Sequence, residues 1–186
     1  MSQRFVLETV QLGLSYGVAN NNGQVSVEES KKIIHLAKKS GIKKLDTAIS
    51  YGKSENLLGH LCDDSWDIIT KLPEAPTEID NINRWAKHQI KKSLHRLGVS
   101  KLYAVMLHTT SVLSSNNSNE YWNTLQELKQ EGLIQKIGYS IYDPSELDKN
   151  FDDFTPEIIQ APFNIIDNRL EAVSYTHLTL PTTPYV

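Results

Sequence analysis

The sequence predicts an α/β fold built around a parallel sheet. Short apolar runs of strand length alternate with longer stretches that carry apolar residues at helical spacing. About six strand-then-helix units follow one another in this way. Such alternation is typical of parallel strands joined by right-handed helical crossovers. Two architectures satisfy the pattern: an open doubly wound sheet and a closed barrel.

The first half of the chain supplies three of these units. Strands are predicted at residues 7–12, 42–45 and 66–70. Ser26 and Glu29 form a capping box at the start of the first helix, which runs to about Ser40 and is ended by Gly41. Ser54 is expected to cap a short second helix.

The second half repeats the pattern. Strands are predicted at residues 102–107, 134–139 and 157–161, and helices at 82–97 and 120–131, with a polar loop over 111–119. Gly98 stops the helix over 82–97. Asp143, Pro144 and Glu146 have the residue types of an N-cap, an N1 proline and an N3 glutamate, so another helix is expected to begin there.

Composition excludes several classes of function. The chain has 186 residues, a formal net charge of −3 and 39% hydrophobic residues, without the basic patch of a nucleic-acid binder. A single cysteine, Cys62, rules out a disulfide framework and a cysteine metal cluster. We find no apolar run of membrane length and no apolar signal-peptide core in residues 1–10. We therefore expect a cytoplasmic protein with no metal, nucleic-acid or membrane partner; no pattern specifies an oligomeric state.

Polar side chains mark the ends of three successive strands. They are Asp46, Lys71 and His108, and Tyr51 lies in the loop after Asp46. No glycine-rich phosphate loop of the open-sheet type follows any strand. In a barrel, the carboxyl ends of the strands hold the catalytic groups. We therefore expect these four side chains to converge at one mouth of the sheet.

These four groups have complementary chemistry. A tyrosine hydroxyl ordinarily has a pKa near 10, and a neighbouring ammonium such as Lys71 is expected to lower the pKa of Tyr51. Asp46 would fix Lys71, and His108 would hydrogen-bond a carbonyl oxygen. The set therefore predicts a general acid suited to protonating a developing alkoxide.

The same residues resemble the signature of the aldo/keto reductase family. The resemblance rests on Leu45-Asp46-Thr47-Ala48, Tyr51-Gly52-Lys53-Ser54-Glu55, Leu58-Gly59, Thr70-Lys71 and Leu107-His108. Further matches are Gln11-Leu12-Gly13, Tyr16-Gly17, Ile137-Gly138-Tyr139-Ser140 and Gln160-Ala161-Pro162-Phe163-Asn164. The resemblance covers roughly residues 6–170, with the motifs in the family's order.

The resemblance implies a (β/α)8 barrel of the TIM type, truncated here after about the sixth strand. It implies NADPH, with NADH possible, as hydride donor to a small carbonyl substrate. Tyr51 would donate the proton, Lys71 and Asp46 would tune it, and His108 would orient the carbonyl. Ser140 and Gln160 would hydrogen-bond the nicotinamide carboxamide, with Asp46 also near the nicotinamide ribose. Ile141 stands where the family often has asparagine, which removes one expected carboxamide contact.

Two regions follow from this interpretation. Residues 1–172 form an incomplete reductase-like barrel, and residues 173–186, which contain two prolines and no helical period, are expected to be a non-native tail. The 186-residue chain is then expected to be an inactive or unstable fragment of an active parent. Two other functions remain open. Lys71 could form a Schiff base in an aldolase or a related lyase, or the domain could be a non-catalytic regulatory or binding subunit with the reductase fold.

Overall fold

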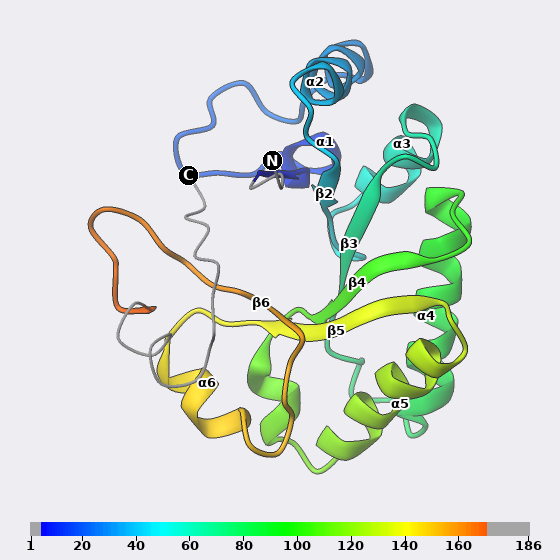
Figure 1. Ribbon diagram of the computed structural model, residues 1–186, viewed down its shortest axis with the longest axis vertical. Helices are drawn as coiled ribbons and strands as arrows, with labels where there is room; N and C mark the ends of the chain where they lie inside the picture. Colours follow the sequence, from blue (N-terminus) through cyan, green and yellow to red (C-terminus); the bar gives the residue numbers. More distant parts are fainter. Residues whose placement is uncertain (1–4, 171–186) are drawn as a thin grey trace.

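The computed structural model describes residues 5–170, which form one curled parallel sheet with helices on its outer side. The strands pair in the order of the chain, each parallel to the next. They are β1 (Val6–Glu8), β2 (Lys44–Asp46), β3 (Asp67–Leu72), β4 (Leu102–Leu107), β5 (Ile134–Ser140) and β6 (Ile158–Gln160). Figure 1 shows the sheet bending into part of a barrel. Residues 173–186, the expected tail, lie outside the described residues.

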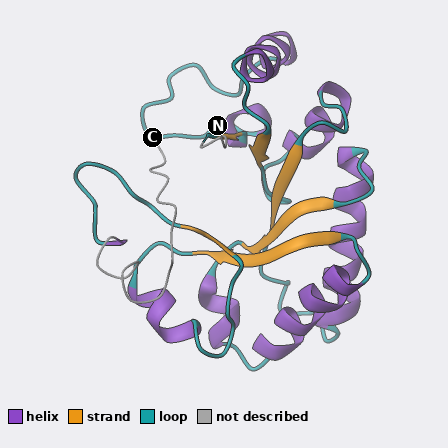
Figure 2. Cartoon of the chain, viewed as in Figure 1, coloured by secondary structure: helices purple, strands orange, loops and turns teal. Residues whose placement is uncertain are grey.

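The helices surround the convex face of the sheet (Figure 2). They are α2 (Val27–Lys39), α3 (Ser54–Leu61), α4 (Ile82–Leu97), α5 (Ser118–Gln130) and α6 (Ser145–Asn150). Two shorter elements are α1 (Val10–Gly13) and the 3₁₀ helix η1 (Thr110–Ser114). An open doubly wound sheet carries helices on both faces, so the curl and the one-sided cover favour the barrel. No helix within residues 5–170 has the length and apolar character needed to cross a membrane.

The core lies between the convex face and the helices. Alternate residues of a strand point to opposite faces, so Ile68, Thr70 and Leu72 of β3 face α3 and α4, whereas Ile69 and Lys71 face the concave side. The buried face of α4 follows the helical repeat predicted from the sequence, with Ala86, Ile90, Leu94 and Leu97. The concave side is therefore left for polar side chains near the carboxyl ends of the strands.

The predicted first strand is wrong beyond Glu8. The chain turns at Thr9, whose N–H donates to the Asp46 carbonyl, and residues Val10–Gly13 form the short helix α1. The Glu8 carboxylate accepts hydrogen bonds from the N–H groups of Thr9 and Val10, which stabilises the turn. The apolar residues of α1 are buried although they are not in a strand. A short run of apolar residues therefore could not distinguish a strand from a short helix.

Of two predicted helix N-caps, one is confirmed and the other is wrong. Ser26 is confirmed as an N-cap, because its hydroxyl accepts from the Glu29 N–H. The prediction for Ser54 is wrong, since Lys53 is the N-cap residue and makes no side-chain cap bond. The buried Ser54 hydroxyl instead donates to Thr9, so it joins α3 to the turn after β1.

Other element boundaries shift by a few residues. Lys71 lies within β3 rather than after it, and the predicted polar loop over 111–119 contains part of η1 and the first residues of α5. Pro144 rather than Asp143 is the N-cap of α6. The Asp143 carboxylate still accepts from the Ser145 N–H, and the Glu146 carboxylate reaches back to the N–H of Asp143. The polar pattern at this helix start therefore stabilises it as capping residues do.

We predict that Gly59→Ala destabilises the fold. An added Cβ at Gly59 would lie 2.1 Å from the Arg96 carbonyl oxygen at the end of α4. Overpacking of this kind typically costs about 1–3 kcal/mol, more than the roughly 1 kcal/mol that alanine gains over glycine in a helix. Urea denaturation should show a lower free energy of unfolding. The exposed neighbour variant His60→Ala should stay within about 0.5 kcal/mol of the wild type; equal stability of all three proteins would contradict the close packing of α3 on α4.

Candidate active site

A buried ion pair lies at the carboxyl ends of β2 and β3. Only 2% of the Lys71 side chain is exposed, and its ammonium lies 2.7 Å from Asp46 Oδ1. The same ammonium donates to the Thr47 carbonyl at 3.1 Å and to the Tyr51 hydroxyl at 3.3 Å. Lys71 therefore has three protein oxygens as partners, one of them the phenol expected to act as an acid.

Tyr51 is held by a compact loop between β2 and α3. Its N–H donates to the Ala48 carbonyl, and its own carbonyl accepts from the Ser54 N–H. Gly52 adopts a φ of 57°, a left-handed conformation that glycine reaches without strain. On the other side of the loop, a Cβ at Gly13 would lie 1.8 Å from the Tyr51 carbonyl oxygen. Two glycines thus let the loop pack against α1 with the phenol over Lys71.

His108 follows β4 and lies beside the phenol. The rings of Tyr51 and His108 meet edge to face, with centroids 5.8 Å apart. His108 Nδ1 is 3.1 Å from the Ser50 hydroxyl. Burial, followed by the positive charge of Lys71, lowers the pKa of His108 below its ordinary value. The imidazole is therefore neutral near pH 7 and can hydrogen-bond a carbonyl oxygen.

Gln160 joins the last strand to the ion pair. Its amide nitrogen donates to Asp46 Oδ2 at 2.5 Å, which connects β6 with β2 across the curled sheet. Ser140, at the end of β5, is buried and lines the same cavity as Gln160. Ile141 is also buried, and its N–H donates to the Gln160 carbonyl. Ser140 and Gln160, which the family resemblance implied as site residues, thus lie at the mouth that also holds Asp46 and Lys71.

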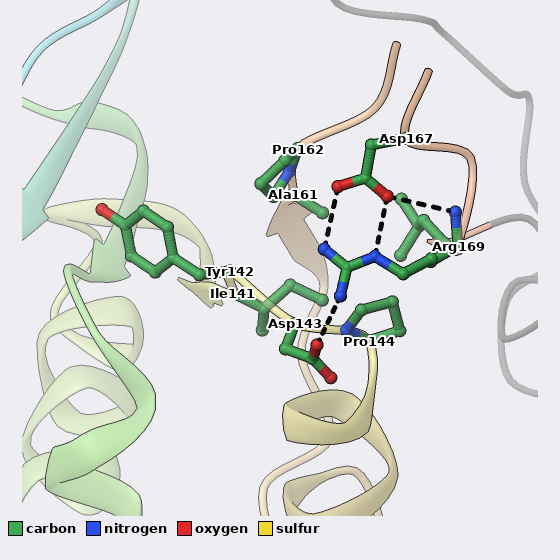
Figure 3. Close-up of a pocket in the computed structure, with 9 residues that line it drawn as sticks. Ile141, Tyr142, Asp143, Pro144, Ala161, Pro162, Asp167 and Arg169 are labelled. Atoms are coloured by element: carbon green, nitrogen blue, oxygen red, sulfur yellow. Dashed lines mark hydrogen bonds and ion pairs between the residues drawn. The ribbon is translucent and has the colours of Figure 1, made fainter. Parts of the chain in front are cut away.

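A cavity of about 480 Å³ opens over this cluster. Tyr51, Lys71, His108, Ser140 and Gln160 all line it, together with Glu8 and apolar residues of β1 and of the segment after β6. The volume is that of a site for a small ligand. A second depression, formed by the segments that follow β5 and β6, is closed by Arg169, which pairs with Asp167 and Asp143 (Figure 3). The larger cavity is thus the candidate active site.

The pKa of Tyr51 departs from the expectation based on Lys71. Burial raises it above its ordinary value, and the nearby carboxylates of Glu8 and Asp46 raise it further. The expected lowering by the ammonium is therefore wrong for this state of the site. The phenol keeps its proton at neutral pH, which is the form that a general acid requires.

Glu8 is a site residue that the sequence reasoning missed. One carboxylate oxygen accepts from the N–H groups of Thr9 and Val10 at 2.9 and 3.2 Å, and the other lies 3.9 Å from Lys71 Nζ. Burial and the charge of Asp46 raise the pKa of Glu8 to about 7. The signal was present, because Glu8 is a polar residue at a strand end like Asp46. It was hidden because the first strand was predicted to be longer than it is.

A second buried carboxylate, that of Glu55, lies next to the site on the helix side of β3. Glu55 of α3 accepts hydrogen bonds from Thr70 and Ser93, each at 2.7 Å, and from Arg96 Nε at 2.7 Å. These contacts join α3, β3 and α4 next to Lys71. Glu55 has charged and hydroxyl partners for both oxygens, which a buried carboxylate requires. We infer a structural role for this part of the signature.

The titratable side chains gather at the carboxyl ends of parallel strands in a curled sheet, which is where (β/α)8 barrels carry their functional groups. A model of the Aldo/keto reductase family matches residues 11–177, and the chain belongs to that family. An uncharacterized oxidoreductase of Schizosaccharomyces pombe is 29% identical over 73% of this chain and 51% of its own length. D-arabinose 1-dehydrogenase of Saccharomyces cerevisiae is 30% identical over 59% of this chain and 36% of its own length.

Solved structures show the same fold. A Pseudomonas aeruginosa protein assigned to the aldo-keto reductases superposes with a TM-score of 0.75 at 26% identity, over 93% of this chain and 69% of that chain. A Bombyx mori aldo-keto reductase, solved in complex with NADP, has a TM-score of 0.69 at 21% identity, over 92% of this chain and 58% of that one. The expected truncated (β/α)8 fold is confirmed. The chain spans about half the length of the first curated relatives that it matches.

We predict that Lys71→Met strongly destabilises the protein at neutral pH. Removal of the ammonium leaves the Asp46 carboxylate buried without its partner, which typically costs about 3–5 kcal/mol. The double variant Asp46→Asn/Lys71→Met removes both charges and should recover most of this loss. Urea denaturation at pH 7 of the wild type, both single variants and the double variant measures the coupling. Additive losses would show that the ion pair does not carry this energy.

We also predict that Glu8→Gln flattens the pH dependence of stability. A carboxyl group with a pKa of about 7 instead of 4.5 binds its proton more tightly in the folded state. Stability due to Glu8 therefore falls as the pH rises from about 4.5 to 7. Since 43% of this side chain is exposed, solvent screening reduces the effect to about 1 kcal/mol. Denaturation curves at pH 4.5, 6 and 8 test this, and parallel profiles of variant and wild type would contradict it.

Proposed function

We propose that the protein reduces a small aldehyde or ketone to an alcohol, with NADPH or NADH as hydride donor and Tyr51 as proton donor. The observation that carries this proposal is the contact of the Tyr51 hydroxyl with the buried Asp46–Lys71 pair at a cavity of ligand size. Family membership supports the reaction class. The physiological substrate class is a carbonyl compound small enough for this cavity.

The residues around the cavity fit a nicotinamide group. The Ser140 hydroxyl and the Gln160 amide, which stand at the ends of β5 and β6 and line the cavity, supply the donors and acceptors that a carboxamide needs. A bound nicotinamide cofactor supplies the hydride. Binding of NADP by the Bombyx mori structure is in line with NADPH as the cofactor of this protein. Ile141 adds an apolar wall where an amide was expected.

Tyr51 is proposed to protonate the alkoxide oxygen that develops when hydride arrives. Its raised pKa keeps the phenol protonated until that moment. The Lys71 ammonium, 3.3 Å from the hydroxyl, would stabilise the phenolate that the proton leaves behind. Neutral His108, in edge contact with the Tyr51 ring, would donate to the same carbonyl oxygen and orient it.

The geometry does not favour a Schiff base on Lys71. A nucleophilic lysine needs a free amine that the substrate can approach. Here only 2% of the side chain is exposed, and the ammonium already contacts Asp46, Thr47 and Tyr51. No observation favours the regulatory subunit over the enzyme.

We predict that Tyr51→Phe lowers kcat by about 10²- to 10⁴-fold, the usual contribution of general acid catalysis. The ring and its packing on His108 are kept, so the affinity for the nucleotide should change little. Steady-state oxidation of NADPH with saturating 4-nitrobenzaldehyde in the full-length protein measures kcat, and fluorescence titration measures the affinity for the nucleotide. Tyr103→Phe is a matched control, because that ring lies between Lys44 and Lys136 rather than at the cavity. Wild-type turnover by Tyr51→Phe would exclude the proposed proton donor.

A further inference from the structure

Within the part of the chain that the structure describes, the charge of Glu8 is the one charge in the candidate site that no other group compensates. Asp46 and Lys71 form a close pair at 2.7 Å, so their charges compensate each other. Tyr51 and His108 are both neutral near pH 7, since the pKa of Tyr51 is raised and that of His108 is lowered. The ionisation of Glu8 therefore decides whether this cluster carries a net charge of zero or one negative charge.

Glu8 lies on the cavity rather than behind it. Its carboxylate lines the opening together with Tyr51 and Lys71. The Lys71 ammonium is 3.9 Å from Glu8 and attracts it, but the Asp46 carboxylate, which lies 2.7 Å from the same ammonium, repels Glu8 and offsets that attraction. Among the described residues that line the cavity, Lys71 is the only ammonium or guanidinium.

The groups around Glu8 come from every strand of the curled sheet. Asp46 of β2 and Lys71 of β3 interact with Glu8 directly. The other titratable groups that line the same cavity are Tyr51 of the loop before α3, His108 after β4 and Tyr142 after β5. Ser140 and Gln160, which end β5 and β6, are polar but do not titrate. Glu8 is thus the carboxylate of the cavity that lacks a close cationic partner of its own.

We propose that Glu8 makes the site distinguish the two oxidation states of the nicotinamide cofactor, by favouring the cationic oxidised ring over the neutral reduced ring. This inference rests on the proposed function. The two states of the nucleotide have the same phosphates and the same adenosine, and differ in charge at the nicotinamide. A carboxylate in the cavity attracts a cation there and has no net charge to attract in the reduced ring. Glu8 therefore opposes release of the oxidised product and favours the reverse reaction, alcohol oxidation.

The discrimination depends on pH in a defined direction. Below the pKa of Glu8, its carboxyl is neutral and gives no preference between the two nucleotides. Above it, the carboxylate favours the oxidised one. By linkage, binding of the oxidised nucleotide near pH 6.5 to 7 must release part of a proton from Glu8, whereas binding of the reduced nucleotide releases none from it.

The test compares NADP⁺ and NADPH affinities by isothermal titration calorimetry in the full-length protein. At pH 8.5, Glu8→Gln should weaken NADP⁺ binding by roughly 5- to 10-fold, the size of one charge interaction across a partly solvated cavity, and leave NADPH within about twofold. At pH 5.5 the variant and the wild type should agree for both nucleotides. Titrations in buffers of different ionisation enthalpy should show proton release with NADP⁺ in the wild type and none in Glu8→Gln.

Two further variants make the result decisive. Glu8→Asp keeps the charge and should keep the preference for NADP⁺, which separates charge from folding damage. Glu28→Gln removes an exposed carboxylate of α2 and should change nothing. Equal changes in the affinities for NADP⁺ and NADPH, or an unchanged ratio in Glu8→Gln, would overturn this inference alone. Failure of the wild type to bind either nucleotide would overturn the proposed function, and the inference with it.

Discussion

The site depends on one buried ion pair, between Asp46 and Lys71. Two charges that are almost fully removed from water are tolerated only when each is paired and hydrogen-bonded. This requirement fixes the pairing of β2 with β3. Asp46 lies opposite Ile69, and Lys71 follows two residues later on the same face of β3, where its ammonium meets Asp46 and the loop after β2. A shift of one residue would turn Lys71 into the apolar helix layer. The same constraint therefore specifies the register of the sheet and the position of the proposed acid.

A network of buried hydroxyl groups helps to hold the loop that carries Tyr51. Thr9, Thr47 and Ser54 form a buried chain of hydrogen bonds that joins the turn after β1 to the start of α3. Satisfied networks of this kind define one geometry, because any displacement leaves a buried polar atom without a partner. Gly13 allows the backbones to approach more closely than any side chain would permit. Small polar residues thus place the phenol, although none of them takes part in the proposed chemistry.

The alternation of strands and helices in the sequence predicted which site residues lie at strand ends. It did not predict the features that depend on where an element ends and on how deeply a side chain is buried. Asp46 and His108 were found because parallel strands bring their carboxyl ends to one edge, which alternation alone predicts. The pattern could not show that α1 replaces the end of the first strand, because a four-residue apolar turn and a short strand look alike, and Glu8 was missed for that reason. It also gave the wrong direction for the pKa of Tyr51. The Lys71 ammonium does contact the Tyr51 hydroxyl, but burial and the carboxylates of Glu8 and Asp46 have a stronger effect on the pKa of Tyr51. Burial is set by the packing of elements that are distant in the sequence.

The strand order explains why most of the site residues lie on neighbouring strands. Because β1 to β4 follow one another in the sheet as they do in the chain, the carboxyl ends that hold Glu8, Asp46, Lys71 and His108 are neighbours at one edge of the sheet. The groups proposed to hold and move the proton therefore sit on adjacent strands and interact directly. The Gln160–Asp46 contact is different, since it spans the concave face and joins residues 114 positions apart. The proposed proton chemistry thus relies on adjacent strands, whereas the proposed cofactor contacts depend on the curl of the whole sheet. A change in curvature would therefore disturb nucleotide binding before it disturbed the Asp46–Lys71–Tyr51 cluster.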